Sequence, residues 1–224
     1  MRFASHRDIA RALERALRRA GLPVAYSAGF SPHPKISYAG AAPTGVASEA
    51  EYFELTLSAD LPPETVRAAL DDSMPEGIDV LDAVFAGEGS LADRLTASDW
   101  RIELPGVDAE RAGTAAAAFL AADTVEVERL TKKGRRRFDT RAAVAHLRVE
   151  PAGTREAQSA YAIIRMVVRH TTPAVRPDDV LTGLHQVAGL APPSPPLVTR
   201  LAQGPLDEAS GVIANPLARE GQDR

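Results

Sequence analysis

The sequence has no cysteine among its 224 residues. This absence excludes a disulfide framework, a thiolate zinc site, an iron–sulfur cluster held by this chain and a cysteine nucleophile. The chain also lacks an apolar run of the roughly 20 residues that a helix needs to cross a bilayer. It has no apolar segment of the secretory type at its start either. We therefore expect a cytoplasmic protein without a membrane partner.

Recognisable catalytic motifs are missing as well. The five histidines show no i, i+4 pair beside a carboxylate, which argues against a metal site. We find no phosphate-cradling glycine loop of the Walker type, no dinucleotide fingerprint and no serine nucleophile elbow. The sequence therefore predicts no metal, no cofactor and no catalytic residue, and we expect a protein that is not an enzyme.

Charge is present but strongly segregated. The chain carries a formal net charge of −4, yet residues 1–35 sum to +5, residues 44–128 to −15 and residues 129–141 to +6. Such segregation creates local potentials that the total conceals. The two basic islands suit an anionic ligand, an acidic partner protein, or attraction to the acidic body of the same molecule.

Hydrophobic periodicity and turn signals predict two halves of similar order. In the first half we expect a strand at 1–3, a helix from Ser5 to Gly21, strands at 24–26, 36–39 and 52–57, a helix from Pro62 and a strand at 78–85. In the second half we expect a strand at 100–104, a helix from Asp108 to about residue 122, a strand at 125–128, a basic loop at 131–137, a strand ending at Val149, a strand at 160–170, a helix from Pro177 to Gly189 and a strand at 197–201.

We interpret each half, which has one further short strand between its two helices, as β-α-β-β-α-β, the order of the split βαβ or ferredoxin-like unit. We predict an α+β fold of two tandem ferredoxin-like halves with antiparallel sheets, over residues 1–88 and 98–203. The first strand, Met1 to Phe3, is expected to be truncated. Residues 204–224 are polar and without pattern, which predicts a disordered tail.

The first candidate site is a stripe of arginines on the N-terminal helix. Arg7, Arg11, Arg15 and Arg18 share the face opposite the apolar one, and guanidinium groups in such a row suit several phosphates. The alternative interpretation is an ordinary solvated helix face.

The second candidate is the basic run of the second half. Lys132, Lys133, Arg135, Arg136 and Arg137 lie within six positions and repel one another. Folding does not require that arrangement, which favours a polyanionic partner. The alternative is a basic surface loop without a ligand.

The third candidate is the loop at 26–35, which prolines stiffen. Phe30 and His33 offer flat faces and Lys35 a charge, and stacking beside a cation is typical of single-stranded nucleic-acid binding. In the alternative, Phe30 fills the core and His33 caps a backbone group.

The first fifty residues carry a resemblance to a known family. The segments that carry it are Ser5 to Asp8, Leu13 to Ala20, Tyr26 to Ser37, Gly45-Val46 and Glu51-Tyr52, and a second signature is Thr131 to Gly134 with Arg137, Asp139 and Arg141. They resemble the bacterial radical-SAM-linked domain of unknown function, which occurs fused to or encoded beside cobalamin-binding radical SAM proteins. The resemblance implies a radical SAM partner, and no catalytic residue.

Three functional hypotheses follow from these observations. In the leading one, the chain is a non-catalytic accessory protein that binds RNA through the two basic islands and the loop, and presents it to a radical SAM protein. In the second, it is an adaptor that docks this partner without RNA. In the third, it cleaves RNA with His6 or His33 as general acid–base.

Overall fold

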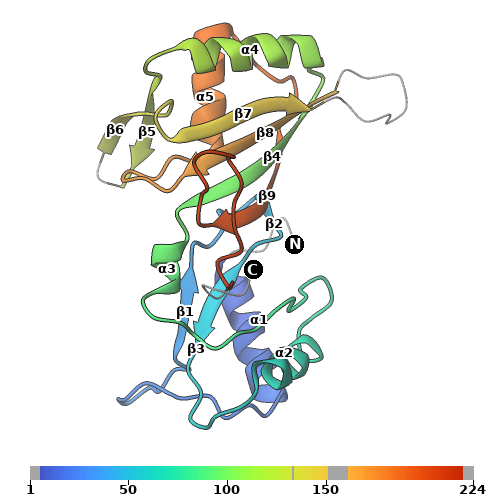
Figure 1. Cartoon of the computed structure of the whole chain (residues 1–224), viewed down its shortest axis with the longest axis vertical. Helices are drawn as coiled ribbons and strands as arrows, with labels where there is room; N and C mark the ends of the chain where they lie inside the picture. Colours follow the sequence, from blue (N-terminus) through green and yellow to red (C-terminus); the bar gives the residue numbers. More distant parts are fainter. Residues whose placement is uncertain (1–5, 133, 151–160, 219–224) are drawn as a thin grey trace. The chain divides into compact units, whose positions relative to one another are not determined.

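The computed structural model describes residues 6–132, 134–150 and 161–218 (Figure 1). The chain divides into two compact units, one formed by residues 1–95 with 215–224 and the other by Thr96–Ala214. The division between Leu95 and Thr96 falls inside the interval of 89–97 that the sequence leaves between its two predicted halves. Each unit has its own core.

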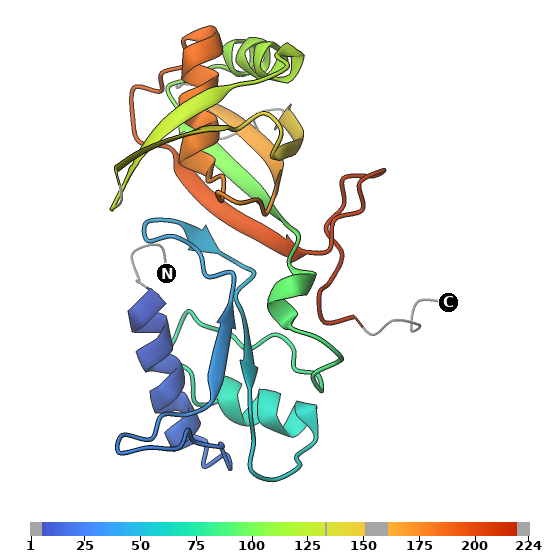
Figure 2. The same cartoon turned by 90° about the vertical axis from the view of Figure 1, so that its left-hand side faces the viewer.

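The first unit packs two helices against a small antiparallel sheet (Figure 2). Its elements are α1 (His6–Arg19), β1 (Ile36–Ala39), β2 (Ala47–Ser48), β3 (Tyr52–Leu55), α2 (Pro63–Asp71) and α3 (Leu91–Arg94). β1 and β3 pair from Ile36–Leu55 to Ala39–Tyr52. Leu13 and Leu17 of α1 and Leu70 of α2 are buried together in the core of this unit. The predicted first helix is confirmed, whereas the strand expected at 1–3 and the cap expected at Ser5 lie outside the described residues.

One predicted strand of the first unit is wrong. Residues 78–85 form neither a strand nor a helix, although their composition of valine, isoleucine and phenylalanine is typical of strands. A strand needs a neighbour to receive its ladder of hydrogen bonds. In the described part of the chain no strand pairs with this segment. The strand expected at 24–26 is likewise reduced to single bridges, Val24 to Leu57 and Tyr26 to Pro34.

The second unit is built on an antiparallel sheet with the strand order β9-β4-β8-β7. Its elements are β4 (Ala97–Pro105), α4 (Ala109–Ala121), β5 (Glu126–Thr131), β6 (Gly134–Asp139), β7 (Val144–Glu150), β8 (Tyr161–Arg169), α5 (Pro177–Ala188) and β9 (Leu197–Gly204). Figure 1 shows α4 and α5 packed together beside the sheet, with the β5–β6 hairpin at one side of it. Ile102, Leu104 and Ile164 are fully buried between strands and helices.

Local signals predict the helices of this unit well. The Asp108 side chain accepts a hydrogen bond from the backbone N–H of Arg111 at 2.7 Å, as expected of a helix N-cap. α5 begins at Pro177, and Gly189 ends it in the left-handed conformation with φ of 64°. The predicted helices in the second half are therefore confirmed.

Two predictions of irregular structure need correction. Residues 134–137 form the start of strand β6 instead of a loop, because β5 supplies a full antiparallel ladder from Glu126–Asp139 to Thr131–Gly134. The predicted disordered tail is also wrong up to residue 218. Leu206 pairs with Ile213, and Arg169 binds the Glu208 carboxylate at 2.6 Å, which lowers the pKa of Glu208 below its ordinary value. Residues 219–224 of this predicted tail lie outside the described residues.

The fold is therefore mixed α+β, with five helices in the part of the chain that the structure describes. In the second unit the elements follow the predicted β-α-β-β-α-β order once the β5–β6 hairpin is set aside. Within the first unit, the described residues pair β1 with β3 in a two-stranded sheet, so a tandem ferredoxin-like arrangement is not confirmed. None of the helices described here has both the length and the apolar composition of a membrane span.

Packing at Gly183 in α5 gives a test of this core. A methyl group there would lie 2.9 Å from both Phe119 and Val125, which are buried, so Gly183→Ala should lower the free energy of unfolding by about 1–3 kcal/mol. The matched control is Gly113→Ala in α4, where nothing lies within 4 Å. It should raise stability by up to about 1 kcal/mol through helix propensity. Urea unfolding measures both, and equal effects would contradict the described packing.

Candidate nucleic-acid interface

The arginine stripe of α1 faces solvent. Ala12, Leu13, Ala16 and Leu17 are at most 5% exposed and turn the opposite face of the helix into the core. Arg7, Arg11, Arg15 and Arg18 are all exposed. Within the described residues none of these four guanidinium groups forms an ion pair with a carboxylate. The stripe therefore offers a row of uncompensated positive charges.

The loop at 26–35 projects from the end of the unit at which α1 ends (Figures 1 and 2). Its base is closed by hydrogen bonds between Ser27 and His33, from Ser27 N–H to the His33 carbonyl at 2.8 Å and from His33 N–H to the Ser27 hydroxyl at 3.1 Å. Gly29 has a φ of 128°, a value that favours glycine. The loop is therefore held in a defined turn.

The tip of this loop exposes an aromatic ring. Phe30 is 111% exposed, so the alternative in which it fills the core is wrong. His33 and Lys35 are exposed as well. The hydrogen bond from His33 to the Ser27 hydroxyl comes from the His33 backbone N–H and does not involve the His33 imidazole. An aromatic ring with a nearby imidazole and ammonium group has the chemistry to stack on a base and to contact a phosphate.

The basic run of the second unit is partly neutralised by its own hairpin. On the outer face of β5–β6, Arg135 binds Glu128 at 2.8 Å and Arg137 binds Glu126 at 3.1 Å. Lys132 and Arg136 are exposed and form no ion pair with the described residues. Lys133 lies outside the described residues. The hairpin thus retains fewer available cations than the sequence suggests.

Arg129, in the middle of β5, has a structural role. Its guanidinium binds the buried Asp179 carboxylate at 2.7 Å and lies over the Phe138 ring, 4.9 Å from the centroid. Burial raises the pKa of Asp179, and its hydrogen bond from the Arg176 backbone and the nearby Arg129 oppose that rise. This arginine therefore fixes the hairpin against α5 and is not available to a ligand.

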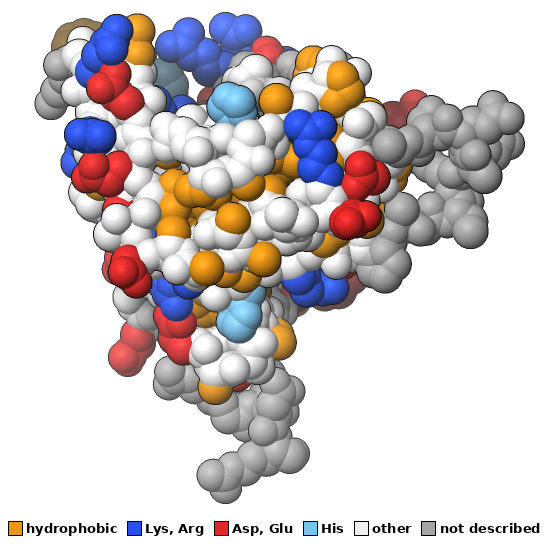
Figure 3. All heavy atoms as spheres, turned by 90° about the horizontal axis from the view of Figure 1, so that it is seen from above, with side chains coloured by type: hydrophobic (Ala, Val, Ile, Leu, Met, Phe, Trp, Pro, Cys, Tyr) orange, Lys and Arg blue, Asp and Glu red, His pale blue; other side chains and the backbone are white. Residues whose placement is uncertain are grey.

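The candidate residues fall into two groups, one in each unit. Arg7, Arg11, Arg15 and Arg18, together with Phe30, His33 and Lys35, belong to the first unit, and the basic hairpin belongs to the second. On the face shown in Figure 3, basic and acidic side chains lie next to one another around a largely uncharged centre. The stripe and the loop are therefore the best-defined part of the candidate interface.

The arrangement gives little support to acid–base catalysis. The side chain of His6 lies outside the described residues, and His33 stands exposed on its loop. A serine–histidine pair does occur, with Ser98 Oγ 2.7 Å from His170 Nε2. Ser98 is only 1% exposed, which keeps its hydroxyl from any substrate, so we interpret the pair as structural. No group of three or more histidine, aspartate or glutamate side chains in the described residues has the geometry to hold a metal ion.

Sequence reasoning overlooked one exposed feature. Leu81, Val84 and Phe85 are 77%, 38% and 56% exposed. Their pattern is that of a half-buried strand, and periodicity alone does not reveal whether a strand finds a neighbour. No signal in the sequence identifies this surface.

The exposure of Phe30 leads to a direct test. Because its ring contacts solvent alone, Phe30→Ala should change the free energy of unfolding by less than about 0.5 kcal/mol. Leu13→Ala, at a position 1% exposed, should cost about 2–5 kcal/mol. Denaturant unfolding measures both variants. A loss above about 1 kcal/mol for Phe30→Ala would mean that the ring packs inside the protein.

Comparison with known proteins places the chain in a family. No curated protein matches its sequence. A family model does, over residues 1–177, and its description is "Uncharacterized protein conserved in bacteria (DUF2344)". This match spans well over half of the 224 residues and includes the arginine stripe, the exposed loop and the basic hairpin. The chain therefore belongs to the bacterial DUF2344 family.

Proposed function

We propose that this protein is a non-catalytic RNA-binding accessory protein. The stripe of α1 contacts successive phosphates, and the loop at 26–35 contacts an unpaired base through Phe30. The observation that carries this proposal is the row of four exposed arginines without an ion pair in the described residues. Exposed guanidinium groups on one helical face suit a polyanion because each forks around a phosphate.

Phe30 supports RNA over other polyanions. Cations are enough to bind a phosphate chain, so such a ligand does not explain an exposed aromatic ring. The Phe30 ring lies fully exposed at the tip of a closed loop and is not part of the core. Stacking of a base on such a ring is worth about 1–3 kcal/mol. Sequence-specific RNA binding targets unstacked bases in loops and ends. The proposed ligand is therefore an RNA with accessible single-stranded bases.

The hairpin and the second unit have supporting roles in this proposal. Lys132 and Arg136 provide further phosphate contacts, whereas Arg135 and Arg137 first have to leave Glu128 and Glu126. We also propose that the second unit is a ferredoxin-like domain with an inserted hairpin. The antiparallel order β9-β4-β8-β7 and the connections through α4 and α5 support that interpretation.

We further propose a radical SAM protein as the partner that receives the RNA, in the cytoplasm. This part rests on the resemblance of Ser5 to Asp8 and of Tyr26 to Ser37 to the radical-SAM-linked domain. A second candidate function is an adaptor that binds this partner without RNA. The exposed side chains of Leu81, Val84 and Phe85 favour it, because apolar groups gathered on a surface are typical of protein interfaces.

Salt dependence tests RNA binding. Filter binding of transfer RNA and ribosomal RNA fragments at two salt concentrations should show affinity falling steeply as salt rises. Arg11→Gln/Arg15→Gln should weaken binding at low salt and reduce the slope of log affinity against log salt by about 1.5, since each phosphate contact contributes about 0.7–0.9. Glutamine keeps the helix propensity of the site.

The matched control removes the same charge elsewhere. Arg148→Gln/Arg169→Gln deletes two arginines that already bind Glu150 and Glu208 at 3.0 and 2.6 Å. It should leave the salt slope within about 0.3 of the wild-type value. Absence of binding at low salt would end the proposal, and equal losses for the two double variants would remove α1 as the contact surface.

A further inference from the structure

The segment 81–87, which links the α2 region to α3, presents apolar side chains to solvent. Leu81, Val84 and Phe85 are 77%, 38% and 56% exposed within five positions. Scattered exposed apolar residues are ordinary, but three large ones together on one short segment are not. A surface of this kind is typical of protein interfaces.

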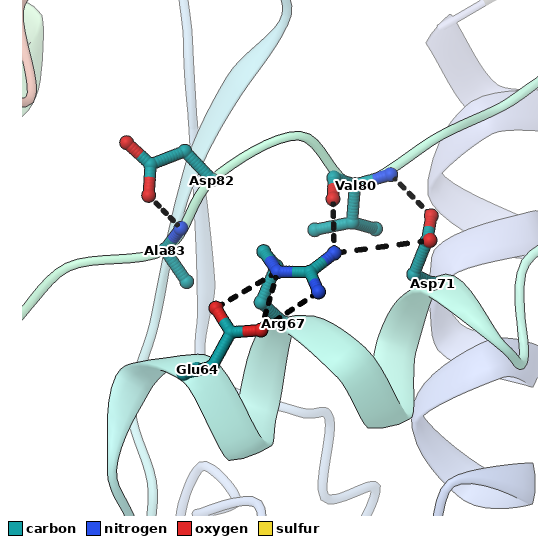
Figure 4. A network of polar contacts seen from close by, with 6 residues as sticks. All are labelled: Glu64, Arg67, Asp71, Val80, Asp82 and Ala83. Atoms are coloured by element: carbon teal, nitrogen blue, oxygen red, sulfur yellow. Dashed lines mark hydrogen bonds and ion pairs between the residues drawn. The ribbon is translucent and has the colours of Figure 1, made fainter.

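Both ends of this segment are fixed to the first unit by arginines. At Val80, Figure 4 shows the Arg67 guanidinium between Glu64 and Asp71. Arg67 donates to the Val80 carbonyl at 3.3 Å, and the Val80 N–H donates to Asp71 at 2.7 Å. We call this group of contacts around Arg67 a clamp. The hydrogen bond from Arg67 lowers the pKa of Glu64, so the Arg67–Glu64 pair is ionic at neutral pH.

At Glu88, the other end of the segment, Arg94 forms a second clamp. Its guanidinium donates to the Glu88 carbonyl at 2.9 Å. The segment between Val80 and Glu88 is therefore held in place without a ladder of its own. Its position is defined before any partner arrives, which reduces the entropy lost on binding.

The backbone between these clamps is unpaired in the part of the chain that the structure describes. Among the described residues, the peptide groups of 81–87 form no hydrogen bond with another element, and the one bond within it joins Ala83 N–H to the Asp82 side chain. The segment contains no turn and no residue of positive φ. Such a row of free donors and acceptors is a template for a further strand.

The surroundings of the segment are acidic. No lysine or arginine occurs between Arg67 and Arg94, whereas seven aspartates and glutamates do. Asp79, Asp82 and Glu88 are exposed and form no ion pair with described residues. RNA is repelled by this surface, and a basic polypeptide is attracted to it.

We propose that 81–87 is a docking site for an extended segment of a partner protein, one that alternates apolar and basic residues and adds as a strand. Its peptide groups pair with those of 81–87, its apolar side chains cover Leu81 and Phe85, and its cations meet Asp82 on the opposite face. A second copy of this chain is a poor occupant. A two-fold pairing of the segment with itself brings acidic side chains against acidic ones, which opposes it.

A basic peptide tests this proposal on the full chain. The probe is a fluorescein-labelled peptide of about the length of the segment that alternates lysine and valine, followed by anisotropy. We expect binding that weakens with salt, and slower hydrogen exchange at the amides of 81–87. Phe85→Ser should lower the affinity at least about tenfold. Val212→Ser, a matched control at an exposed apolar site of the second unit, should leave the affinity unchanged.

Two modified probes separate strand addition from simple attraction. A peptide with alternate backbone amides N-methylated keeps its charge and loses its donors, so it should bind at least about tenfold more weakly. A peptide with glutamate in place of lysine should not bind. Equal binding of the methylated probe, or equal binding by Phe85→Ser and Val212→Ser, would overturn the proposal.

The other occupants give distinct results. Sedimentation that shows a dimer in the wild type and a monomer in Leu81→Ser/Phe85→Ser would replace the partner protein by a second copy. If the basic start of the same chain occupied the site, it would compete with the peptide, and Arg2→Glu would weaken that competition. A tenfold rise in peptide affinity in Arg2→Glu would therefore assign the site to the start of the chain. RNA binding enters none of these measurements, so their failure is independent of the proposed RNA function.

Discussion

The burial of one face of α1 determines what the first unit presents to its surroundings. Leu13, Ala16 and Leu17 are at most 3% exposed and pack with Leu70 of α2. A helix turns once every 3.6 residues, so fixing these side chains in the core directs Arg11, Arg15 and Arg18 away from it. The exposed cations are thus a direct consequence of apolar packing. Any change that rotated α1 would remove the charge row and the core together.

The hairpin β5–β6 shows the opposite relation between structure and charge. Its cross-strand register sets Glu128 opposite Arg137 and Leu130 opposite Arg135, with Glu126 and Glu128 close enough to bind both arginines. The pairing of β5 with β6 therefore places the arginines of the basic run beside glutamates of β5, which neutralise part of its charge. Exposed ion pairs of this kind contribute little to stability, so breaking them costs little free energy.

Local signals account for what the sequence predicted correctly. Asp108, Pro177 and Gly189 delimit helices through their own side-chain or backbone geometry, and the spacing of Leu13 and Leu17 identifies the buried face of α1. The errors concern strands. Residues 78–85 have the composition of a strand without a neighbour, and residues 134–137 form one because β5 lies beside them. Pairing depends on distant parts of the chain, which periodicity does not record. For the same reason the ion pairs of Arg135 and Arg137 are invisible before the register is known.

The first unit has two surfaces of opposite charge, the α1 stripe and the region around 81–87, and each suits a different kind of partner. The α1 stripe carries four uncompensated cations, whereas all the Asp, Glu, Lys and Arg side chains from residue 68 to residue 93 are acidic ones. A phosphate chain is attracted to the first and repelled by the second, and a basic strand experiences the reverse. Under the two proposals, this separation of charge suppresses competition between an RNA and a basic protein segment without a conformational change. Under the same two proposals, one small unit binds a nucleic acid and a protein at once, which is the arrangement that an accessory protein requires.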